Sequence, residues 1–267
     1  MKQVVQIRCK NNKKTQKVAN GSTLSDIFSS FNLKMEHGPV SAKVNNKVEG
    51  MHYRVYNNKD IEFLDMRTSS GSRAYTRTLF FVLCKAVQDL YPGHDVVIDI
   101  PVSNGFYVDV RLERDVTADD VDCIRKRMQE IVDARMPIRR YMVPTEDAIA
   151  LFEEKGDVEK VKLLRTSGSL YTAYYKIGEY VDFYYGTLLT NTSQLYLFGL
   201  EKYYDGMLLR IPSLKNPDEL GEVTRQDKMF EIFKEHHHWQ DIIGIRTVGD
   251  FNAAVDAGHA TDIINIS

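Results

Sequence analysis

The chain has 267 residues, 43% of them hydrophobic and 27% charged, which is enough to bury one large core or two smaller ones. A net charge of −2 excludes the strongly basic composition of a dedicated nucleic-acid binder, although a local basic face is compatible with that total. Three widely spaced cysteines without a C-x-x-C pair indicate neither a disulfide framework nor a zinc ribbon. No apolar run reaches the length of a membrane span, so we expect a cytoplasmic protein with no membrane contact.

The first 67 residues predict a small sheet with one helix. Residues 4–8 and 15–18 alternate polar and apolar side chains around a polar turn, which is typical of a hairpin. Ser22 or Thr23 can cap a helix over about residues 23–31. The apolar side chains of that helix recur at the spacing of one buried face, namely Leu24, Ile27, Phe28 and Phe31.

Further short strands are expected after this helix, at residues 40–44, 53–55 and 60–64. Two strands, a helix and more strands within so short a segment predict a ubiquitin-like β-grasp domain over residues 1–67.

Three segments of this domain resemble a TGS domain, a module found at the N-terminus of threonyl-tRNA synthetases and in some regulatory GTPases and nucleotide-handling enzymes. They are residues 21–27 (GSTLSDI), 42–48 (AKVNNKV) and 60–64 (DIEFL). The resemblance implies a domain that binds partners or ligands and is not itself an enzyme.

A run of small polar residues follows, at 68–72 (TSSGS). This composition is expected of a flexible junction, so we predict a linker at residues 68–74. Beyond it, an apolar helix is expected over residues 79–90, ending before Pro92. Strands at 96–100 and 106–112 are predicted to pair through a turn in which Gly105 takes a positive φ.

Thr117 is predicted to cap a long amphipathic helix that Pro137 prevents from extending. A second helix is expected over residues 145–155, followed by a tyrosine-rich segment from 170 to 185. Together these elements predict a larger α+β domain over residues 75–212, and the fold class of the whole chain is α+β.

The larger domain resembles the second additional, or editing, domain of threonyl-tRNA synthetases. The resemblance is carried by residues 101–109 (PVSNGFYVD) and 180–186 (YVDFYYG). Shorter motifs occur in the expected order: LYP at 90–92, LER at 112–114, KRM at 126–128 and PIRR at 137–140.

In that family one helix supplies an H-x-x-x-H pair and a later segment supplies C-x-x-x-H, a composition typical of a zinc site. By register, the two histidine positions fall on Arg77 and Phe81, and the later cysteine and histidine positions fall on Tyr184 and Leu188. A guanidinium, a phenyl ring and an aliphatic side chain offer no lone pair, and one tyrosine makes a poor metal site. We therefore expect an editing fold with no metal and no catalytic residue.

The same register predicts a ligand pocket. A guanidinium there can pair with a carboxylate or phosphate, and aromatic rings can stack on a base, so we expect an amino acid, nucleoside or nucleotide, or else a scaffold that has lost ligand binding. The candidate ligand-binding residues are Arg77, Phe81, Tyr107, Asp109, Asp182, Tyr184 and Tyr185. Most other tyrosines are expected to fill the core.

Residues 213–267 are expected to form a C-terminal extension. Residues 203–212 (YYDGMLLRIP) resemble bacterial uridine-kinase-like proteins, in which TGS and editing-type domains precede a P-loop kinase. No G-x-x-x-x-G-K-[ST] loop occurs in the chain, so a covalently linked kinase would lie beyond residue 267, and ATP and Mg are expected only there.

The expected function is therefore that of a non-catalytic, regulatory or ligand-binding portion of a nucleoside-kinase-like protein, with no cofactor of its own. Two alternatives stay open: a trans-acting aminoacyl-tRNA deacylase and a tRNA-binding module, the latter possible but not favoured. A phosphate-facing patch for tRNA would comprise Arg139, Arg140, Lys160 and Lys162.

The histidines are expected to have structural roles. The run at 236–238 favours a helix end or a packed aromatic cluster over a metal site, because adjacent residues of a helix point in different directions and no cysteine or further histidine lies at ligand spacing. The isolated histidines are expected on the surface or in turns, and they are His37, His52, His94 and His259.

Overall fold

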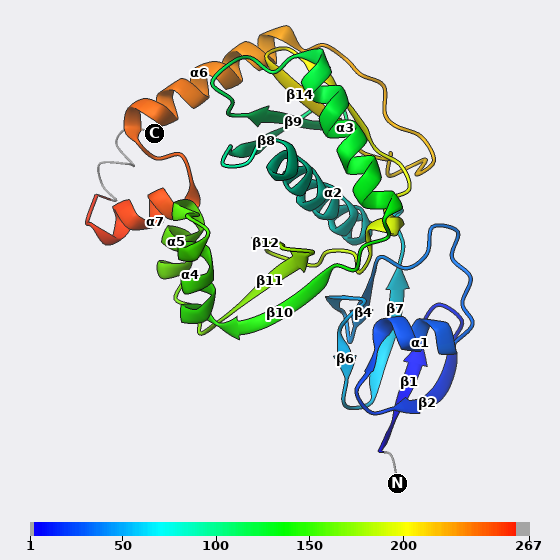
Figure 1. Ribbon diagram of the computed structural model, residues 1–267. Coiled ribbons are helices and arrows are strands. Elements are labelled where there is room, and N and C mark those ends of the chain that lie inside the picture. Colours follow the sequence, from blue (N-terminus) through cyan, green and yellow to red (C-terminus); the bar gives the residue numbers. More distant parts are fainter. Residues whose placement is uncertain (1–2, 260–267) are drawn as a thin grey trace. The chain divides into compact units, whose positions relative to one another are not determined.

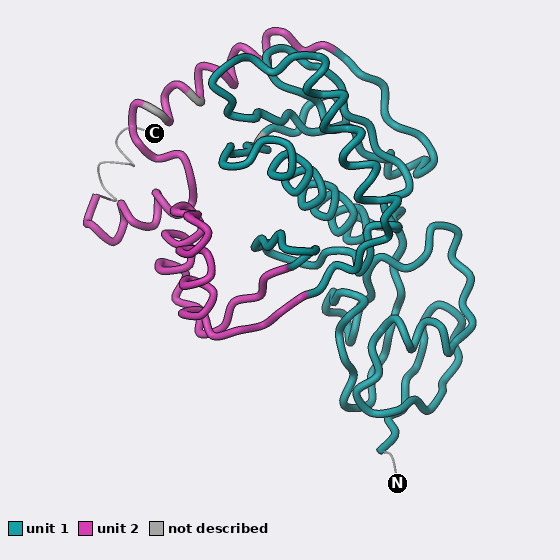
Figure 2. Tube along the Cα trace, in the orientation of Figure 1, with its two compact units in different colours: residues 1–139, 176–224 teal, residues 140–175, 225–267 magenta. Residues whose placement is uncertain are grey.

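A computed structural model describes residues 3–259, apart from the side chains of Asp99, His237 and Asp241 (Figure 1). The parts of the domain predictions that cover residues 1–2 and 260–267 lie outside these described residues. Helices and strands are mixed along the chain, which confirms the α+β class. The chain divides into unit 1, Met1–Arg139 with Lys176–Thr224, and unit 2, Arg140–Tyr175 with Arg225–Ser267 (Figure 2).

Unit 1 begins with a five-stranded sheet in the order β2-β1-β7-β4-β5. Its strands are β1 (Val4–Cys9), β2 (Lys14–Ala19), β4 (Ser41–Val44), β5 (Lys47–Gly50) and β7 (Lys59–Leu64). β1 pairs antiparallel with β2, as the predicted hairpin requires, and parallel with β7. β5 was not predicted, and a short pair, β3 (Ser22–Thr23) with β6 (Arg54–Val55), lies beside the sheet.

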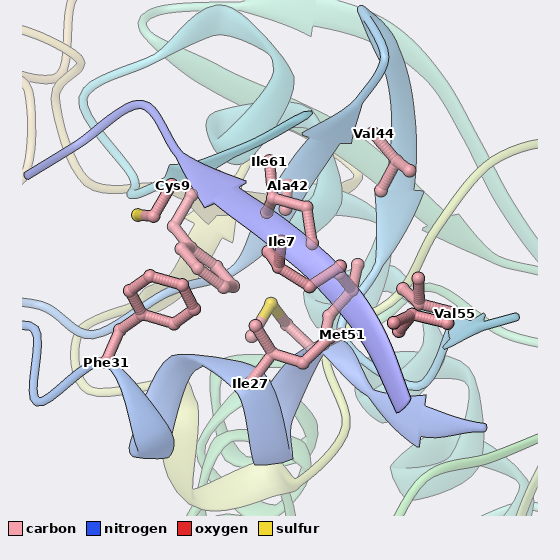
Figure 3. Close-up of a cluster of buried hydrophobic side chains, with 12 residues drawn as sticks. Ile7, Cys9, Ile27, Phe31, Ala42, Val44, Met51, Val55 and Ile61 are labelled. Carbon is pink, nitrogen blue, oxygen red and sulfur yellow. The ribbon is translucent and has the colours of Figure 1, made fainter. Parts of the chain in front are cut away.

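Helix α1 (Leu24–Ser30) covers this sheet and begins where the sequence predicted, because Thr23 forms a capping box with Asp26. Leu24, Ile27 and Phe31 are buried in the core of this sheet and helix. Figure 3 shows Ile27 and Phe31 facing the strands. Phe28 extends the same cluster by packing edge-on against Phe63, with ring centroids 5.1 Å apart.

The predicted linker at residues 68–74 is instead the beginning of helix α2 (Ser69–Leu90). Thr68 caps the helix by accepting a hydrogen bond from the Gly71 N–H at 3.0 Å. A β carbon at Gly71 would lie 1.9 Å from the carbonyl oxygen of Asp65. Gly71 must therefore lack a side chain because the backbone passes close to its neighbour here, and the segment predicted as a flexible linker is part of a helix.

Helix α2 packs against α3 (Ala118–Asp133) beside a four-stranded sheet in the order β13-β14-β9-β8. The strands are β8 (Val96–Val102), β9 (Gly105–Val110), β13 (Gly199–Tyr203) and β14 (Gly206–Arg210). Thr117 caps α3 in a box with Asp120, as predicted. Phe80 of α2 meets Phe106 of β9 edge-on, with ring centroids 4.9 Å apart.

The β8–β9 turn differs from the prediction in where its positive φ angles fall. Ser103 and Asn104 have φ of 50° and 55°, whereas Gly105 already belongs to β9. A β carbon at Gly105 would lie 2.5 Å from the Leu209 carbonyl oxygen. Glycine is therefore needed at this position for close strand packing and not for the turn.

Unit 2 joins two segments that are distant in sequence. Its boundary falls within β10 (Arg139–Pro144) and β11 (Tyr171–Ile177), which with β12 (Tyr180–Phe183) form a sheet in the order β10-β11-β12. Its helices are α4 (Thr145–Glu154), α5 (Val158–Arg165), α6 (Asp227–Ile243) and α7 (Val248–Asp256).

The C-terminal helix α7 packs on α5 through buried Gly249 and an ion pair between Lys162 and Asp250. Residues 140–175 therefore form one unit with 225–267, a division that differs from the predicted succession of domains. Within the described residues, no helix is both long enough and apolar enough to cross a membrane.

Candidate functional site

Helix α2 lies against the segment that follows β12. The Leu189 N–H donates to Thr78 Oγ1 at 2.9 Å, and this hydrogen bond joins the two elements close to the positions that correspond to the family's metal ligands. Arg77 and Phe81 are four residues apart in α2 and so lie on one face of the helix. The four positions that correspond to the expected metal ligands, Arg77, Phe81, Tyr184 and Leu188, thus come from two neighbouring elements.

Phe81 is the centre of this cluster and is fully buried. Its ring centroid lies 5.2 Å from that of Tyr180 and 5.9 Å from that of Tyr184. Leu188 is also fully buried. Two of the three positions where the resemblance places imidazoles therefore contain apolar side chains in core packing, and the third contains Arg77.

A hydrogen-bonded carboxylate adjoins these rings. The Asp182 side chain is buried and accepts from the Tyr180 hydroxyl at 2.9 Å and from the Phe183 N–H at 2.6 Å. The Tyr184 hydroxyl hydrogen-bonds both Asp182 and Cys84. Burial, reinforced by the nearby Cys84 and Asp182, raises the pKa of Tyr180 and of Tyr184 well above the usual range.

Both tyrosines are therefore neutral donors at physiological pH, and they satisfy the Asp182 carboxylate. Sequence reasoning had selected Asp182 and Tyr184 but missed the role of Cys84 and Tyr180. The signal for Cys84 was its place in the same helix, three residues after Phe81.

Arg77 is half-buried and packs on the loop at Gly186. A β carbon at Gly186 would lie 2.7 Å from Arg77 Nη1, and this glycine has a φ of +110°. The absence of a side chain at residue 186 is thus what gives the guanidinium room beside the loop.

The remaining candidates lie elsewhere. Tyr107 and Asp109 alternate along β9 with Phe106, which faces α2, so they belong to the opposite face of the sheet. The Tyr107 hydroxyl donates to Asp205 Oδ1 at 2.6 Å, and burial together with this bond raises the pKa of Tyr107. Tyr185 is 66% exposed and stands edge-on to Phe183.

No family model matches the chain, but individual relatives do. A threonine–tRNA ligase of Syntrophotalea carbinolica is 31% identical over 227 residues, covering 81% of this chain and 36% of the relative. Threonine–tRNA ligases of Marinobacter nauticus and Acetivibrio thermocellus are each 28% identical over 181 residues, or 67% of this chain and 28% of each relative. The chain contains a domain similar to the N-terminal region of threonine–tRNA ligases.

This chain spans only about a third of the length of those ligases. Several motifs that carry the resemblance have structural roles here. Tyr91 donates to Asp120 Oδ1 at 2.7 Å, and Arg114 donates to both Asp120 oxygens, at 2.6 and 2.8 Å. The Arg114 hydrogen bonds hold the pKa of Asp120 far below its usual range, and burial raises the pKa of Tyr91 to about 12.

Two of the four residues of the predicted phosphate patch form ion pairs within the protein. Lys160 pairs with Asp157 and Lys162 with Asp250, so these two cations serve helix packing. Arg139 and Arg140 are exposed on β10. The next residue along the strand, Tyr141, stacks on Tyr174 of β11, with ring centroids 5.2 Å apart and planes inclined by 16°.

Proposed function

We propose that this chain is a non-catalytic binding module built on an editing-type domain. The observation that supports the proposal is the packed cluster around Phe81, where the resemblance places metal-binding histidines. Hydrolysis of an aminoacyl ester needs a polarised water or a positioned base. Asp182, the carboxylate in the cluster, accepts bonds from Tyr180, the Phe183 N–H and Tyr184, so it is a hydrogen-bonded structural group.

The module is proposed to bind a small molecule with a carboxylate or phosphate beside Arg77, of the class of an amino acid, nucleoside or nucleotide. Arg77 is a permanent cation with planar donors, and Tyr185 presents an exposed ring nearby in sequence for stacking. The finer proposal, that binding regulates an attached uridine-kinase-like domain, has its support in the resemblance of residues 203–212.

A thermal-shift comparison with threonine, serine, nucleosides and nucleotides tests ligand binding, because a ligand that binds only the folded state raises the melting temperature. We expect one of these compounds to stabilise the natural chain, and R77A to abolish that shift. Arg73 is an exposed arginine one turn earlier in α2, so R73A is the matched control and should keep the shift. Equal shifts in R77A and the natural chain would show that Arg77 does not contact the ligand.

The similarity to threonine–tRNA ligases favours tRNA binding as a second candidate function. Exposed Arg140 of β10 offers a cation for phosphates, and the stacked pair Tyr141–Tyr174 offers an aromatic surface for bases. Because consecutive strand residues point to opposite faces, the two would contact different parts of the RNA. Uncharged tRNA should then bind with an affinity that falls as salt rises, and R140A should weaken it and flatten the salt dependence. If tRNA binding changes neither with salt nor in R140A, then this surface does not bind tRNA.

A further inference from the structure

Three side chains with metal-binding atoms converge in unit 1, outside the cluster around Phe81. Glu36 and His37 lie in the loop between α1 and β4, and Asp218 lies in the loop that follows β14. One ligand atom from each of the three lies within 4.8 Å of the other two. Within the described residues this is the one such group of three, and it joins segments from distant parts of the sequence.

Tyr196 holds two of these residues in place. Its ring stacks on the His37 imidazole, with centroids 4.9 Å apart and planes inclined by 19°. Its hydroxyl donates to the carbonyl oxygen of Pro217 at 3.0 Å, immediately before Asp218. A further bond from Gln194 Nε2 to the Pro39 carbonyl at 3.3 Å fixes the end of the histidine loop. The arrangement is therefore supported by packing and hydrogen bonds of the protein itself.

The His37 imidazole has unused hydrogen-bonding capacity. Its side chain is only 9% exposed, and its Nε2 points at Asp218 Oδ1 from 3.7 Å, which is too long for a hydrogen bond. Among the residues that the structure describes, no partner forms a hydrogen bond with this ring. An imidazole that is nine-tenths buried normally has a hydrogen-bond partner, and the gap between its Nε2 and the carboxylate is suited to an atom placed between the two.

The charges around the ring favour a cation. Arg67 is the basic residue near Glu36 and Asp218. Its Nε and Nη2 both donate to Asp65 Oδ2, at 3.0 and 2.6 Å. Only its Nη1 approaches Glu36, at 3.6 Å. One guanidinium thus faces three carboxylates, those of Glu36, Asp65 and Asp218, and the local potential is negative.

We propose that Glu36, His37 and Asp218 bind a divalent transition-metal ion, zinc in the first instance. One imidazole nitrogen and two carboxylate oxygens suit zinc better than magnesium or calcium, which prefer oxygen alone. Bonds of about 2.0–2.2 Å would place neighbouring ligand atoms roughly 3–3.5 Å apart. The carboxylates of Glu36 and Asp218 are 66% and 64% exposed, so they are free to move the short distance inward.

The ion would fasten the loop of the N-terminal sheet to the loop after β14. This site does not depend on the binding function proposed for the Phe81 cluster, and it is separate from the register positions of the editing-type resemblance. It gives a role to His37, which the sequence had led us to expect as an isolated surface or turn residue.

Isothermal titration of the chelator-treated protein with zinc chloride tests the proposal. We expect one site whose affinity falls at least about tenfold in H37A and in D218N. Circular dichroism on both variants checks the fold, and D218N changes an exposed side chain that is expected to leave folding intact. Exposed His94 supplies the matched control, H94Q, which should bind zinc like the natural chain.

The histidine run in α6 is the obvious competing zinc ligand, and its removal decides between the two sites. The double variant H236Q/H238Q should keep the tight site if the proposal is right. Loss of binding in H236Q/H238Q, or unchanged affinity in H37A and D218N, would overturn it.

Discussion

Two clusters of polar side chains in unit 1 differ in how fully the protein satisfies them. Around Phe81, the Asp182 carboxylate accepts from Tyr180, from a backbone N–H and from Tyr184. Around His37, the imidazole is almost as buried, yet it faces a carboxylate at 3.7 Å without a hydrogen bond.

The comparison teaches that the family's metal-ligand positions and the side chains with metal-binding atoms lie in different parts of unit 1. The family's motifs would place a metal at the Phe81 cluster, but in this protein the cluster consists of packed, buried rings and hydrogen-bonded polar groups. The His37 cluster belongs to none of the motifs that carry the resemblance, but its imidazole forms no hydrogen bond with any residue that the structure describes. Satisfied polar groups stabilise a fold, whereas unsatisfied ones are available to a ligand.

The largest expected effect is that of F81A. Removing a fully buried phenyl ring from between Tyr180 and Tyr184 should lower the free energy of unfolding by about 3–5 kcal/mol. Urea denaturation measures the change. The control Y185A removes a ring that is 66% exposed and should change stability by less than about 1 kcal/mol. Equal effects of the two variants would show that the cluster is not packed core.

D120N tests a second satisfied carboxylate, which Arg114, Tyr91 and Thr117 all contact. Losing the charge-assisted bonds and weakening the helix cap should reduce the free energy of unfolding by about 1.5–3 kcal/mol at pH 7. Exposed Asp119 in the same turn provides the control D119N, for which we expect a much smaller change.

The same carboxylate makes a prediction about acid stability. Its pKa is lowered in the folded protein, so its contribution is fully present above the unfolded value of about 3.9 and is lost as the pH falls toward the folded value. Stability measured from pH 5 downward should decline below about pH 4, and less steeply in D120N. A parallel decline in the two proteins would mean that other groups cause the acid sensitivity.

G186A examines how Arg77 is held. The new methyl group would lie 2.7 Å from the guanidinium, and alanine is strained at a φ of +110°, so we expect a loss of about 1–3 kcal/mol and a weaker ligand shift. Gly168 also has a positive φ, but a β carbon at this residue would have no neighbour within 4 Å. G168A therefore isolates the backbone strain, and it should leave the ligand shift unchanged.

The smallest change in stability is expected for H37A in the absence of metal. Loss of the stack on Tyr196 should lower the free energy of unfolding by about 0.5–1.5 kcal/mol. Adding zinc should stabilise the natural chain and not H37A, so the difference between their melting temperatures should widen. A constant difference would make His37 a packing residue only.

Locally determined elements were predictable from the sequence. Helices α1 and α3 begin at Thr23 and Thr117 because each threonine and the aspartate three residues later form a capping box within one turn. The linker prediction failed because composition alone does not distinguish a flexible serine–glycine run from one that must be small. The close approach of Gly71 to the Asp65 carbonyl depends on how α2 packs.

The candidate site was predictable in the same uneven way. The alignment of motifs correctly placed Arg77, Phe81, Tyr184 and Leu188 on two adjoining elements, because helix spacing and motif order can both be read from the sequence. The placement of Tyr107 on the other face of the sheet was not foreseen. Neither was the meeting of His37 with Asp218, since their contact depends on the tertiary packing around Tyr196.

The most direct test of the central claim is to measure the release of labelled amino acid from mischarged threonine tRNA, with protein in excess and with zinc either supplied or chelated. A binding module with a packed core around Phe81 predicts release at the rate of the protein-free control under both conditions. Release that is faster with protein, above all if it requires zinc, would contradict that account and identify the chain as a deacylase.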